Sequence, residues 1–313
     1  MMLQSALDPA GPQSARISHL WWVFLAVCTV VYVLVLVLLF IGVARGRRPS
    51  AAPRASEAGL TRAVAAATAA TVVTLFVLLA ASVATGRAVS EHDDPDPLYI
   101  KLTGHQWWWQ AQYKDPSPDR QFETANEIHI PVGRPVIFIV GSADVIHSFW
   151  VPSLHGKVDL IPTHENTLWL RADRAGTYRG QCAEFCGLQH AHMALLVVAE
   201  PPAAFEAWRR DQIAPARAAD TPERRHGERL FTSLPCALCH AIRGTPAGGR
   251  TAPDLTHIAS RLTLAAGTLP NTRGHLAAWI VDPQRIKPGN AMPENLIAAE
   301  DLQSLLDYLG GLP

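Results

Sequence analysis

Two long segments without charged residues near the N-terminus place the strongest constraint on how this chain can fold. Residues 17–44 contain no Asp, Glu, Lys or Arg, and neither do residues 63–86. Because a helix of about 20 apolar residues crosses the hydrocarbon core of a bilayer, each segment is long enough to span it. A signal peptide is the alternative for the first segment, but its apolar part exceeds the usual 7–15 residues or so and a second segment follows. We therefore predict a hairpin of two transmembrane helices, at about 17–44 and 62–87, within residues 1–97.

The charges that flank these segments predict their orientation. The basic residues between them are Arg45, Arg47, Arg48, Arg54 and Arg62, and the only acid there is Glu57. Before the first segment the only basic side chain is Arg16. Short loops rich in Arg and Lys stay in the cytoplasm, so we predict a cytoplasmic connector with both termini on the outer side.

Composition narrows the class of protein. The chain has 313 residues, 27 basic and 27 acidic, and only 17% of its residues are charged. At about 150 residues per domain this length allows roughly two domains. The balanced charge gives no electrostatic attraction to nucleic acid, so we expect no nucleic-acid partner.

The remainder of the chain changes character twice. After residue 97, short β-like runs alternate with turn signals, which is typical of a β-sandwich or barrel. These runs lie at residues 98–102, 127–132, 136–140, 167–172, 177–181 and 194–199. Residues 201–220 read as an Ala- and Arg-rich helical linker. Beyond it we expect no strands, and helical periodicity at 224–231, 275–281 and 300–309 predicts a small helical domain over 221–313.

Four of the five cysteines form two close pairs, and the first pair suggests a metal site. Two thiols, two imidazoles and a thioether occur within twelve residues, at Cys182, Cys186, His190, His192 and Met193. Soft sulfur donors beside imidazole suit copper or zinc, and a methionine donor favours copper. A disulfide between Cys182 and Cys186 is equally compatible with an outward-facing domain. His147, in a distant β-loop, could complete a metal site.

Three segments together resemble subunit II of the haem-copper cytochrome c oxidases. They are residues 104–109 (GHQWWW), 144–152 (DVIHSFWVP) and 182–193 (CAEFCGLQHAHM), behind two apolar segments. The resemblance implies a cupredoxin-like sandwich that holds a dinuclear CuA centre. The ligands it implies are the bridging thiolates of Cys182 and Cys186, the imidazoles of His147 and His190, the thioether of Met193 and the backbone carbonyl of Glu184.

The same resemblance implies roles for two more side chains. The Glu184 carboxylate would reach a magnesium site shared with subunit I, and Trp107 would be the residue where electrons enter. Packing on a half-buried strand is the alternative for Trp107, and it is our expectation for Trp108 and Trp109. The sequence also departs from its relatives, because Ile161-Pro162-Thr163-His164 stands where they commonly read Ile-Pro-Gly-Arg.

The second cysteine pair forms a CxxCH motif, Cys236-Ala237-Leu238-Cys239-His240. Such a motif attaches haem c through two thioether bonds and supplies the proximal histidine. A zinc site would need a second pair, and no cysteine follows residue 239. By elimination among four methionines, Met292 is the candidate for the other axial ligand, with His257 and His275 as competitors.

Residues 221–313 also resemble class I cytochrome c, through Gly227, Phe231, the motif, the Met292-Pro293 loop and the last helix. Fusion of this domain to subunit II is the arrangement of the caa-type oxidases. It implies an electron-input subunit in a bacterial inner membrane, with both soluble domains outside. Electrons from a cytochrome c or a membrane donor complex would pass through haem c and CuA to subunit I, for oxygen reduction coupled to proton pumping, in an assembly that includes subunit III.

Two other functions remain open from the sequence. A haem-copper nitric oxide reductase could use the same electron-input subunit, because the distinguishing chemistry lies in the partner. A copper-delivery or thiol-redox protein would need Cys182 and Cys186 but not His147 or Met193.

Overall fold

The computed structural model describes residues 4–47, 56–91 and 96–313, which form two compact units. One unit comprises residues 15–91, and the other comprises residues 1–14 and 92–313. Arg48 and Arg54, on which part of the orientation prediction depends, lie outside the described residues.

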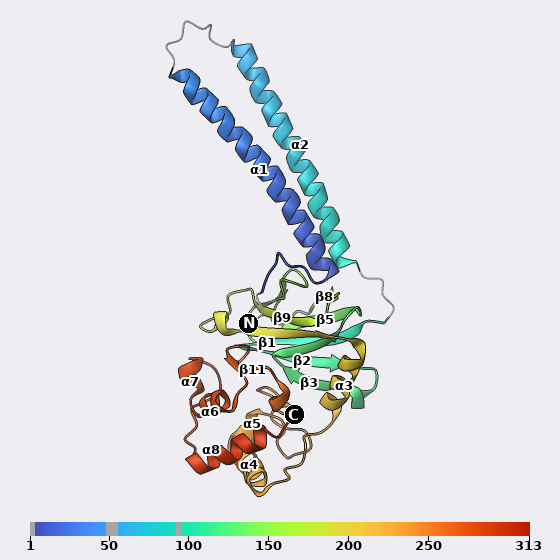
Figure 1. Ribbon diagram of the computed structural model, residues 1–313, viewed down its shortest axis with the longest axis vertical. Helices are drawn as coiled ribbons and strands as arrows, with labels where there is room; N and C mark the ends of the chain where they lie inside the picture. Colours follow the sequence, from blue (N-terminus) through green and yellow to red (C-terminus); the bar gives the residue numbers. More distant parts are fainter. Residues whose placement is uncertain (1–3, 48–55, 92–95) are drawn as a thin grey trace. The chain divides into compact units, whose positions relative to one another are not determined.

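The smaller unit is the predicted helical hairpin. Its helices are α1 (Pro12–Gly46) and α2 (Glu57–Ser90), and Arg16 of α1 donates a hydrogen bond to the carbonyl of Ala88 near the end of α2 (Figure 1). Ser56 caps α2 by accepting a hydrogen bond from the amide of Gly59, which explains why this helix begins at Glu57.

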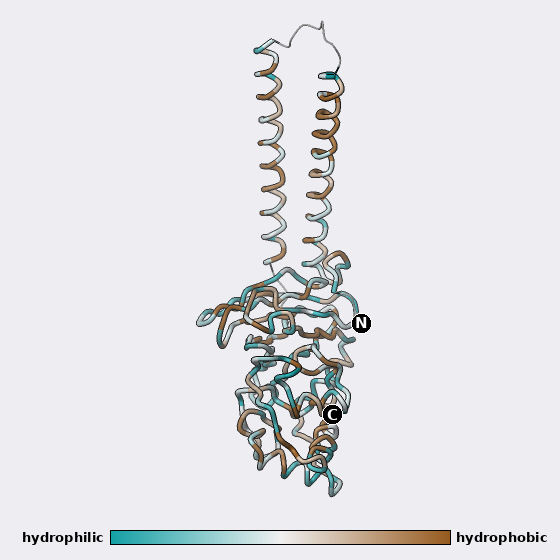
Figure 2. The backbone as a smooth tube through the Cα atoms, turned by 90° about the vertical axis from the view of Figure 1, so that its left-hand side faces the viewer, coloured by the Kyte–Doolittle hydropathy of each residue, from teal (hydrophilic) through white to brown (hydrophobic). Residues whose placement is uncertain are grey.

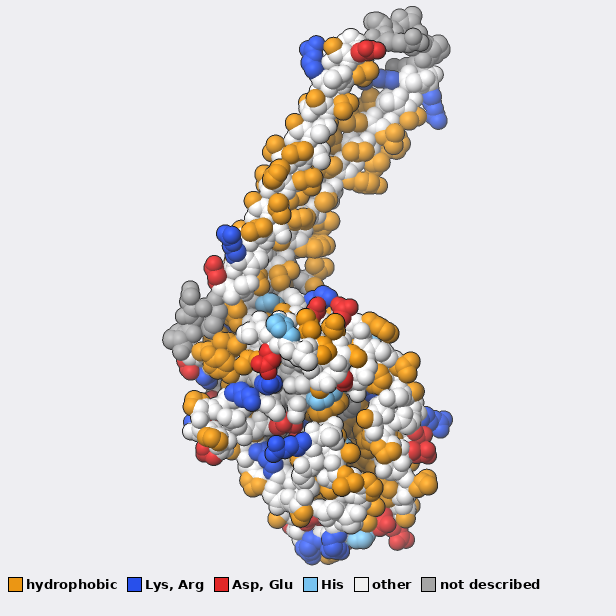
Figure 3. All heavy atoms as spheres, turned by 180° about the vertical axis from the view of Figure 1, so that it is seen from behind, with side chains coloured by type: hydrophobic (Ala, Val, Ile, Leu, Met, Phe, Trp, Pro, Cys, Tyr) orange, Lys and Arg blue, Asp and Glu red, His pale blue; other side chains and the backbone are white. Residues whose placement is uncertain are grey.

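Both helices extend a few residues beyond the predicted spans. They are long and apolar enough to cross a membrane, and hydrophobic residues occur along the length of each (Figure 2). Their side chains are almost entirely exposed, unlike those of a core helix, and charged side chains gather near the helix ends (Figure 3). A membrane anchor is therefore the interpretation that their composition supports.

The larger unit begins with a sandwich of two five-stranded sheets. The first has the order β3-β2-β1-β5-β8, formed by β1 (Leu98–His105), β2 (Trp108–Lys114), β3 (Phe122–Ala125), β5 (Val136–Ser142) and β8 (Asn166–Leu170). The second has the order β4-β10-β9-β6-β7, formed by β4 (Glu127–Pro131), β6 (His147–Trp150), β7 (Val158–Leu160), β9 (Gly176–Cys182) and β10 (Ala194–Glu200). Short 3-10 helices lie at Pro118–Arg120 (η1) and His190–His192 (η2).

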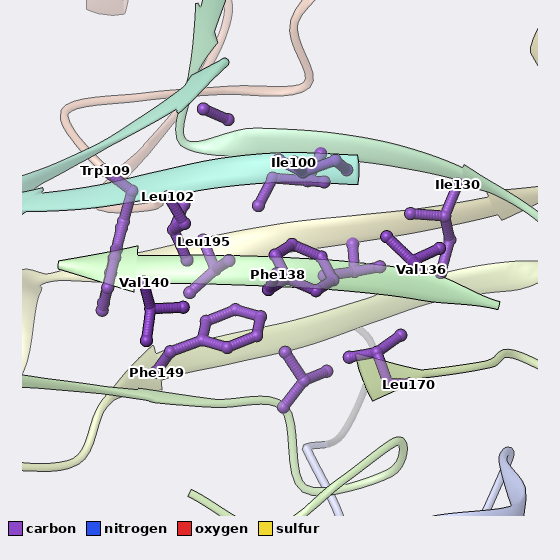
Figure 4. Packing of buried hydrophobic residues seen from close by; sticks show 14 of the residues in the cluster. Ile100, Leu102, Trp109, Ile130, Val136, Phe138, Val140, Phe149, Leu170 and Leu195 are labelled. Atoms are coloured by element: carbon purple, nitrogen blue, oxygen red, sulfur yellow. The ribbon is translucent and has the colours of Figure 1, made fainter. Parts of the chain in front are cut away.

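Alternating apolar residues build the core between the sheets. In β1, Leu98, Ile100 and Leu102 are buried while the side chains between them point outward, the period of two expected for a half-buried strand. The rings of Phe138 and Phe149, from opposite sheets, lie 5.1 Å apart between centroids (Figure 4). This packing gives the ends of β6 and β9 a rigid base.

Short helices dominate the rest of the unit. They are α3 (Pro202–Ile213), α4 (Pro222–Ser233), α5 (Cys236–Cys239), α6 (Arg273–Val281), α7 (Pro283–Ile286) and α8 (Ala299–Leu309), with a 3-10 turn η3 (Ile258–Ser260). The expectation of no strands after residue 221 is wrong in detail. Two antiparallel strands of two residues each occur there, β11 (Thr263–Leu264) and β12 (Leu269–Pro270). It turns through Ala265, Ala266 and Gly267, all with positive φ, and is too short to have a periodic pattern.

The helices α4 and α8 pack directly against each other. A Cβ at Gly227 would lie 2.1 Å from the carbonyl oxygen of Ser304, so only glycine permits this approach. Phe231 and Tyr308 contact each other across the same interface, with ring centroids 6.2 Å apart. Residues that the sequence singled out therefore form the helix crossing of this domain.

The predicted fold class is confirmed. The described chain contains two apolar N-terminal helices, a cupredoxin-like β-sandwich and a helical C-terminal domain. All six predicted strand runs are present as β1, β4, β5, β8, β9 and β10.

Candidate functional site

The first candidate site lies where β6 begins and β9 ends. β6 and β9 pair antiparallel, with Phe149 opposite Cys182, so that His147 lies near the thiol of Cys182. The chain then turns through Cys186 and η2 and enters β10, and the amide of Cys182 donates to the carbonyl of Met193 at 2.8 Å. Strand pairing thus brings a histidine close to residues that lie more than 30 positions later in the sequence.

All six predicted ligand groups meet in this cluster. The two thiol sulfurs are 3.7 Å apart. The Cys182 sulfur lies 3.9 Å from His147 Nδ1 and 3.1 Å from the Glu184 carbonyl oxygen. The Cys186 sulfur lies 3.7 Å from His190 Nδ1 and 3.9 Å from Met193 Sδ. A disulfide requires an S–S distance of about 2.05 Å. With metal–thiolate bonds of about 2.3 Å, both sulfurs can bind one ion. The geometry therefore fits shared metal ions.

Burial and charge favour a cation at this point. Cys182 and Cys186 are each 2% exposed, and His147 and Met193 are fully buried. The hydrogen bond with Cys186 lowers the pKa of Cys182 to about 3. The same contact, together with burial, raises the pKa of Cys186 because a second thiolate beside the first is unfavourable. Positive metal ions would remove that repulsion, and two thiolates with imidazoles are a donor set that suits copper.

Asp144 fixes the orientation of His147. The Nε2–H of His147 donates to Asp144 Oδ1 at 2.7 Å, which leaves Nδ1 facing the thiols. Burial would lower the pKa of His147, but its contacts with Cys182 and Asp144 outweigh burial and raise it. Gly104 makes room for the ring, because a Cβ there would lie 2.8 Å from His147 Cδ2. A carboxylate that orients a histidine in this way is typical of metal sites.

The Glu184 side chain points to a different environment from its carbonyl. Its carboxylate accepts a hydrogen bond from Lys157 Nζ at 3.1 Å, and both side chains are partly exposed. The hydrogen bond with Glu184 raises the pKa of Lys157. The carboxylate is thus accessible at the surface while the backbone carbonyl faces the thiols.

The turn at residues 161–164 has Thr163 at the position where the Ile-Pro-Gly-Arg pattern has glycine. Thr163 adopts a φ of 64°, in the left-handed region that favours glycine. The turn nevertheless closes, with the amide of His164 donating to the carbonyl of Ile161 at 3.2 Å.

Trp107 contacts the ligand loop directly. Its indole Nε1–H donates to the carbonyl of Cys186 at 2.9 Å, and only 7% of the residue is exposed. Gly187, at a φ of 112°, lies against the ring, since a Cβ there would be 3.1 Å from Trp107 Cζ2. Trp109 instead packs in the core, and Trp108 stacks on His105, with centroids 4.3 Å apart.

The second candidate site surrounds α5. Cys236 and Cys239 are its first and last residues, and His240 follows as the C-cap. The Nδ1–H of His240 donates to the carbonyl of Pro253 at 2.7 Å, which leaves Nε2 as the ligand atom. Burial lowers the pKa of His240, favouring the neutral imidazole that binds a metal. These features fit a haem c.

Met292 lies in a loop that its own neighbours hold in place. Its amide donates to Asn290 Oδ1 at 2.8 Å, and its carbonyl accepts from Gln284 Nε2 at 2.7 Å. The competing His257 uses both ring nitrogens for the backbone carbonyls of Pro313 and Ala214, and this argues against it as an axial ligand.

Several residues with clear roles escaped the sequence analysis. Asp144 lies within a recognised segment, but its contact with His147 depends on the fold. Pro253 and Lys287 lie in segments that resemble class I cytochrome c, but no spacing predicts the contacts that they make. Only the tertiary contacts reveal these three.

Comparisons with known proteins find relatives of both domains. Residues 98–200 match the family described as cytochrome c oxidase subunit II, periplasmic domain, and residues 225–313 match the cytochrome c family. A cytochrome c oxidase subunit 2 from Alkalihalophilus pseudofirmus is 36% identical over 321 residues, covering 98% of this chain and 90% of the relative. The Bacillus subtilis protein of the same name is 32% identical over 69% of this chain and 63% of its own length.

A solved structure of the periplasmic domain of subunit II of cytochrome oxidase from Bradyrhizobium japonicum is also similar. It is 32% identical, covers 40% of this chain and 96% of its own, and has a TM-score of 0.36.

Proposed function

The chain belongs to the cytochrome c oxidase subunit 2 family, and from this premise we propose that it is the subunit through which electrons enter the oxidase. The C-terminal domain would hold a haem c that accepts electrons, and the sandwich would hold a dinuclear copper centre through which they would continue to haem in subunit I. Membership makes the chain part of an oxidoreductase that works with subunit I in a membrane. Its two domain families imply copper and haem c binding.

The observation that supports the copper centre is the convergence of six donor groups from separate segments. Cys182 and Cys186 would bridge two ions, and the remaining donors are His147, His190, Met193 and the Glu184 carbonyl. Copper bound here supplies a one-electron redox couple. The protein excludes water by burying the thiols and holds the His147 ring through Asp144, so that the ligands are already in place before an electron arrives.

Haem c is the proposed first acceptor. Cys236 and Cys239 would attach the haem through thioether bonds, and His240, through Nε2, and Met292 would hold its iron. Histidine with methionine raises the haem potential, which suits a donor at the level of cytochrome c. The hydrogen bond to the Pro253 carbonyl fixes the His240 tautomer and ring orientation.

The proposal also gives the chain a membrane location, protein partners and a shared magnesium site. Both soluble domains lie on the outer side of a bacterial inner membrane, in the orientation that the Arg-rich connector favours. Partners are subunit I, subunit III and a cytochrome c or membrane donor complex. The partly exposed Glu184 carboxylate takes part in a magnesium site shared with subunit I, where the cation would replace Lys157 as its partner.

Analysis of the purified membrane complex tests the function. We expect two copper ions and one covalent haem per chain, and oxygen consumption driven by reduced cytochrome c. His147→Ala and Met193→Leu should both change the copper content or spectrum. If neither variant does so, the copper proposal is wrong and a thiol function becomes the better interpretation. Consumption of nitric oxide without consumption of oxygen would instead identify the partner as a nitric oxide reductase.

A further inference from the structure

Lys287 is a buried lysine whose hydrogen-bond acceptors lie in both soluble domains. It is 2% exposed, and its Nζ donates to the carbonyl of Trp107 at 2.7 Å and to the carbonyl of Ala265 at 3.1 Å. Within the described residues no acidic side chain forms an ion pair with it. Burying a lysine is costly, so a lysine whose buried nitrogen joins two backbone carbonyls calls for an explanation.

The segment that begins with Lys287 lies against the copper ligand loop over several residues. Gln189, the neighbour of His190, donates from Nε2 to the carbonyl of Pro288 at 2.8 Å. At the next position, a Cβ on Gly289 would lie 3.7 Å from Trp107 Cη2 and 3.4 Å from Leu188. Three residues later the same segment reaches Met292.

Trp107 therefore lies between the two loops. A Cβ on Gly187 of the copper loop would lie 3.1 Å from Cζ2 of its ring, and a Cβ on Gly289 of the Met292 loop would lie 3.7 Å from Cη2. Its indole Nε1–H is bonded to the Cys186 carbonyl, and its own carbonyl accepts from Lys287. The ring is consequently covered by the C-terminal domain and bonded to the Cys186 loop, while the backbone carbonyl of the same residue is bonded to Lys287.

We propose that Lys287 is a positioning residue for electron transfer inside the chain. Lys287 holds the Met292 loop against Trp107, so that the indole connects that loop with the Cys186 loop. The same contact closes the indole to outside electron donors. The inference rests on the proposed relay and adds a route and a residue to it. The step moves one electron: ferrous haem iron becomes ferric, the copper centre is reduced by one electron, and no bond forms or breaks. An external donor must then deliver its electron to the cytochrome c domain.

The contact does not depend on the charge of Lys287. Burial lowers the pKa of this lysine to about 7, so both protonation states occur near neutral pH. The ammonium has three N–H groups and the neutral amine has two, enough for the two carbonyls in either state. Methionine has a similar length but no donor, so Lys287→Met removes the hydrogen bonds and keeps most of the volume.

The test compares Lys287→Met with the native full-length subunit in the assembled oxidase. Copper content, haem content and both reduction potentials are measured first. Photochemical reduction of haem c then gives the rate at which copper is reduced. We expect a roughly tenfold slower transfer, because loss of a buried hydrogen bond shifts the docking equilibrium by about that factor. The slowed rate should fall further as solvent viscosity rises, since domain docking now limits it.

Hydrogen exchange supplies a readout that does not involve activity. Amides of residues 287, 289–292 and 106–109 should exchange faster in Lys287→Met. Lys101→Met is the matched control, because Lys101 of β1 forms a partly exposed ion pair with Glu165. This variant should change neither the transfer rate nor the amide exchange at these sites. A role in stability alone would lower the unfolding temperature without changing the transfer rate of the folded protein.

The outcomes separate this inference from the function beneath it. If native protein shows no transfer from haem to copper, the proposed relay fails. If native protein transfers and Lys287→Met matches it in rate, viscosity dependence and exchange, only the positioning role is overturned. Should Lys287→Met not take up its cofactors, Lys287→Gln keeps a polar side chain that is too short to reach both carbonyls, and an unchanged transfer rate in that variant overturns the inference.

Discussion

Asp144→Asn is the sharpest test of how the fold prepares the copper ligands. The carboxylate of Asp144 accepts three hydrogen bonds, from His147 Nε2 at 2.7 Å, from the Val145 amide at 2.7 Å and from the Gln106 amide at 2.6 Å. Asparagine has nearly the same shape but only one acceptor oxygen. Its amide nitrogen must therefore face either the His147 ring or a backbone N–H.

The size of the effect follows from that lost acceptor. A hydrogen bond to a charged group contributes about 1.5–3 kcal/mol. If the Asp144 oxygen orients His147 for copper, its loss should weaken copper binding by a corresponding factor of about 10 to 100, because about 1.4 kcal/mol is tenfold. Where the amide nitrogen takes the place of Oδ1, which also accepts from the Val145 amide, the ring loses the contact that holds Nδ1 toward the thiols. Where it takes the place of Oδ2, the contact with the ring remains but the acceptor has lost its charge.

The measurement is copper retention in the full-length, haem-loaded subunit under competition with a chelator of known affinity. Asp173→Asn is the control, since Asp173 pairs with Arg171 at the surface and is 46% exposed in its side chain. The control should keep native copper affinity. An Asp144→Asn affinity within twofold of native, with the same copper spectrum, would refute the role given to the carboxylate.

The pH dependence gives an independent check on this reasoning. Burial would raise the pKa of Asp144, but the hydrogen bonds from His147, Gln106 and Val145 outweigh burial and lower it. A lowered pKa means that the carboxylate's contribution is present above the ordinary value of about 3.9 and is lost as pH falls through the lower folded value. Asp144 also raises the pKa of His147, whose Nδ1 must lose its proton to bind copper. The affinity ratio of native protein to Asp144→Asn should therefore be greatest in alkaline solution, shrink as pH falls through the raised pKa of His147, and shrink again in strong acid as Asp144 is protonated.

Two further predictions concern stability. Gly227→Ala would place a Cβ 2.1 Å from the carbonyl oxygen of Ser304 and should destabilise the cytochrome c domain by about 2 kcal/mol or more. Unfolding followed by haem absorbance measures this loss. Gly274→Ala is the control and should be nearly neutral, because no atom lies within 4 Å of its Cβ. Burial raises the pKa of Tyr113 well above 10.0, so the free energy of unfolding of the sandwich should fall as pH rises above about 10. Tyr113→Phe should abolish this pH dependence. At neutral pH the variant should lose about 1–3 kcal/mol in denaturant unfolding, because the hydroxyl bonds to both the N–H and the carbonyl of His129.

The sequence predicts those parts of this protein that depend on short-range patterns. Long uncharged segments indicate the hairpin, and alternating or buried runs indicate six strands. β2 is harder to recognise, because Trp108–Lys114 contains Ala and two Gln, which have low strand propensity, although Trp109, Ala111 and Tyr113 alternate correctly toward the core. Its place is set by pairing with β1 and β3 and not by its own composition.

In the candidate sites, the sequence predicts the donor residues but not the groups that orient them. Donor types and spacing identify Cys182, Cys186 and the CxxCH motif from the sequence alone. The groups that orient these donors are single carboxylates or carbonyls, such as Asp144 and the carbonyl of Pro253, and no spacing distinguishes them from surface residues. Contacts between domains, such as that of Lys287, require both folded domains and leave no local signal.

Strand register links the sandwich to its metal ligands. Phe149 and His147 are two positions apart in β6, so they face the same side, and the ring of Trp109 lies near both, at centroid distances of 6.1 and 6.3 Å. Phe149 pairs with Cys182, the last residue of β9. A slip of one residue would turn His147 away from the thiols and also expose Phe149. Burial of an aromatic side chain therefore selects the register in which the imidazole meets the sulfurs, so that the hydrophobic core and the ligand geometry depend on one and the same pairing.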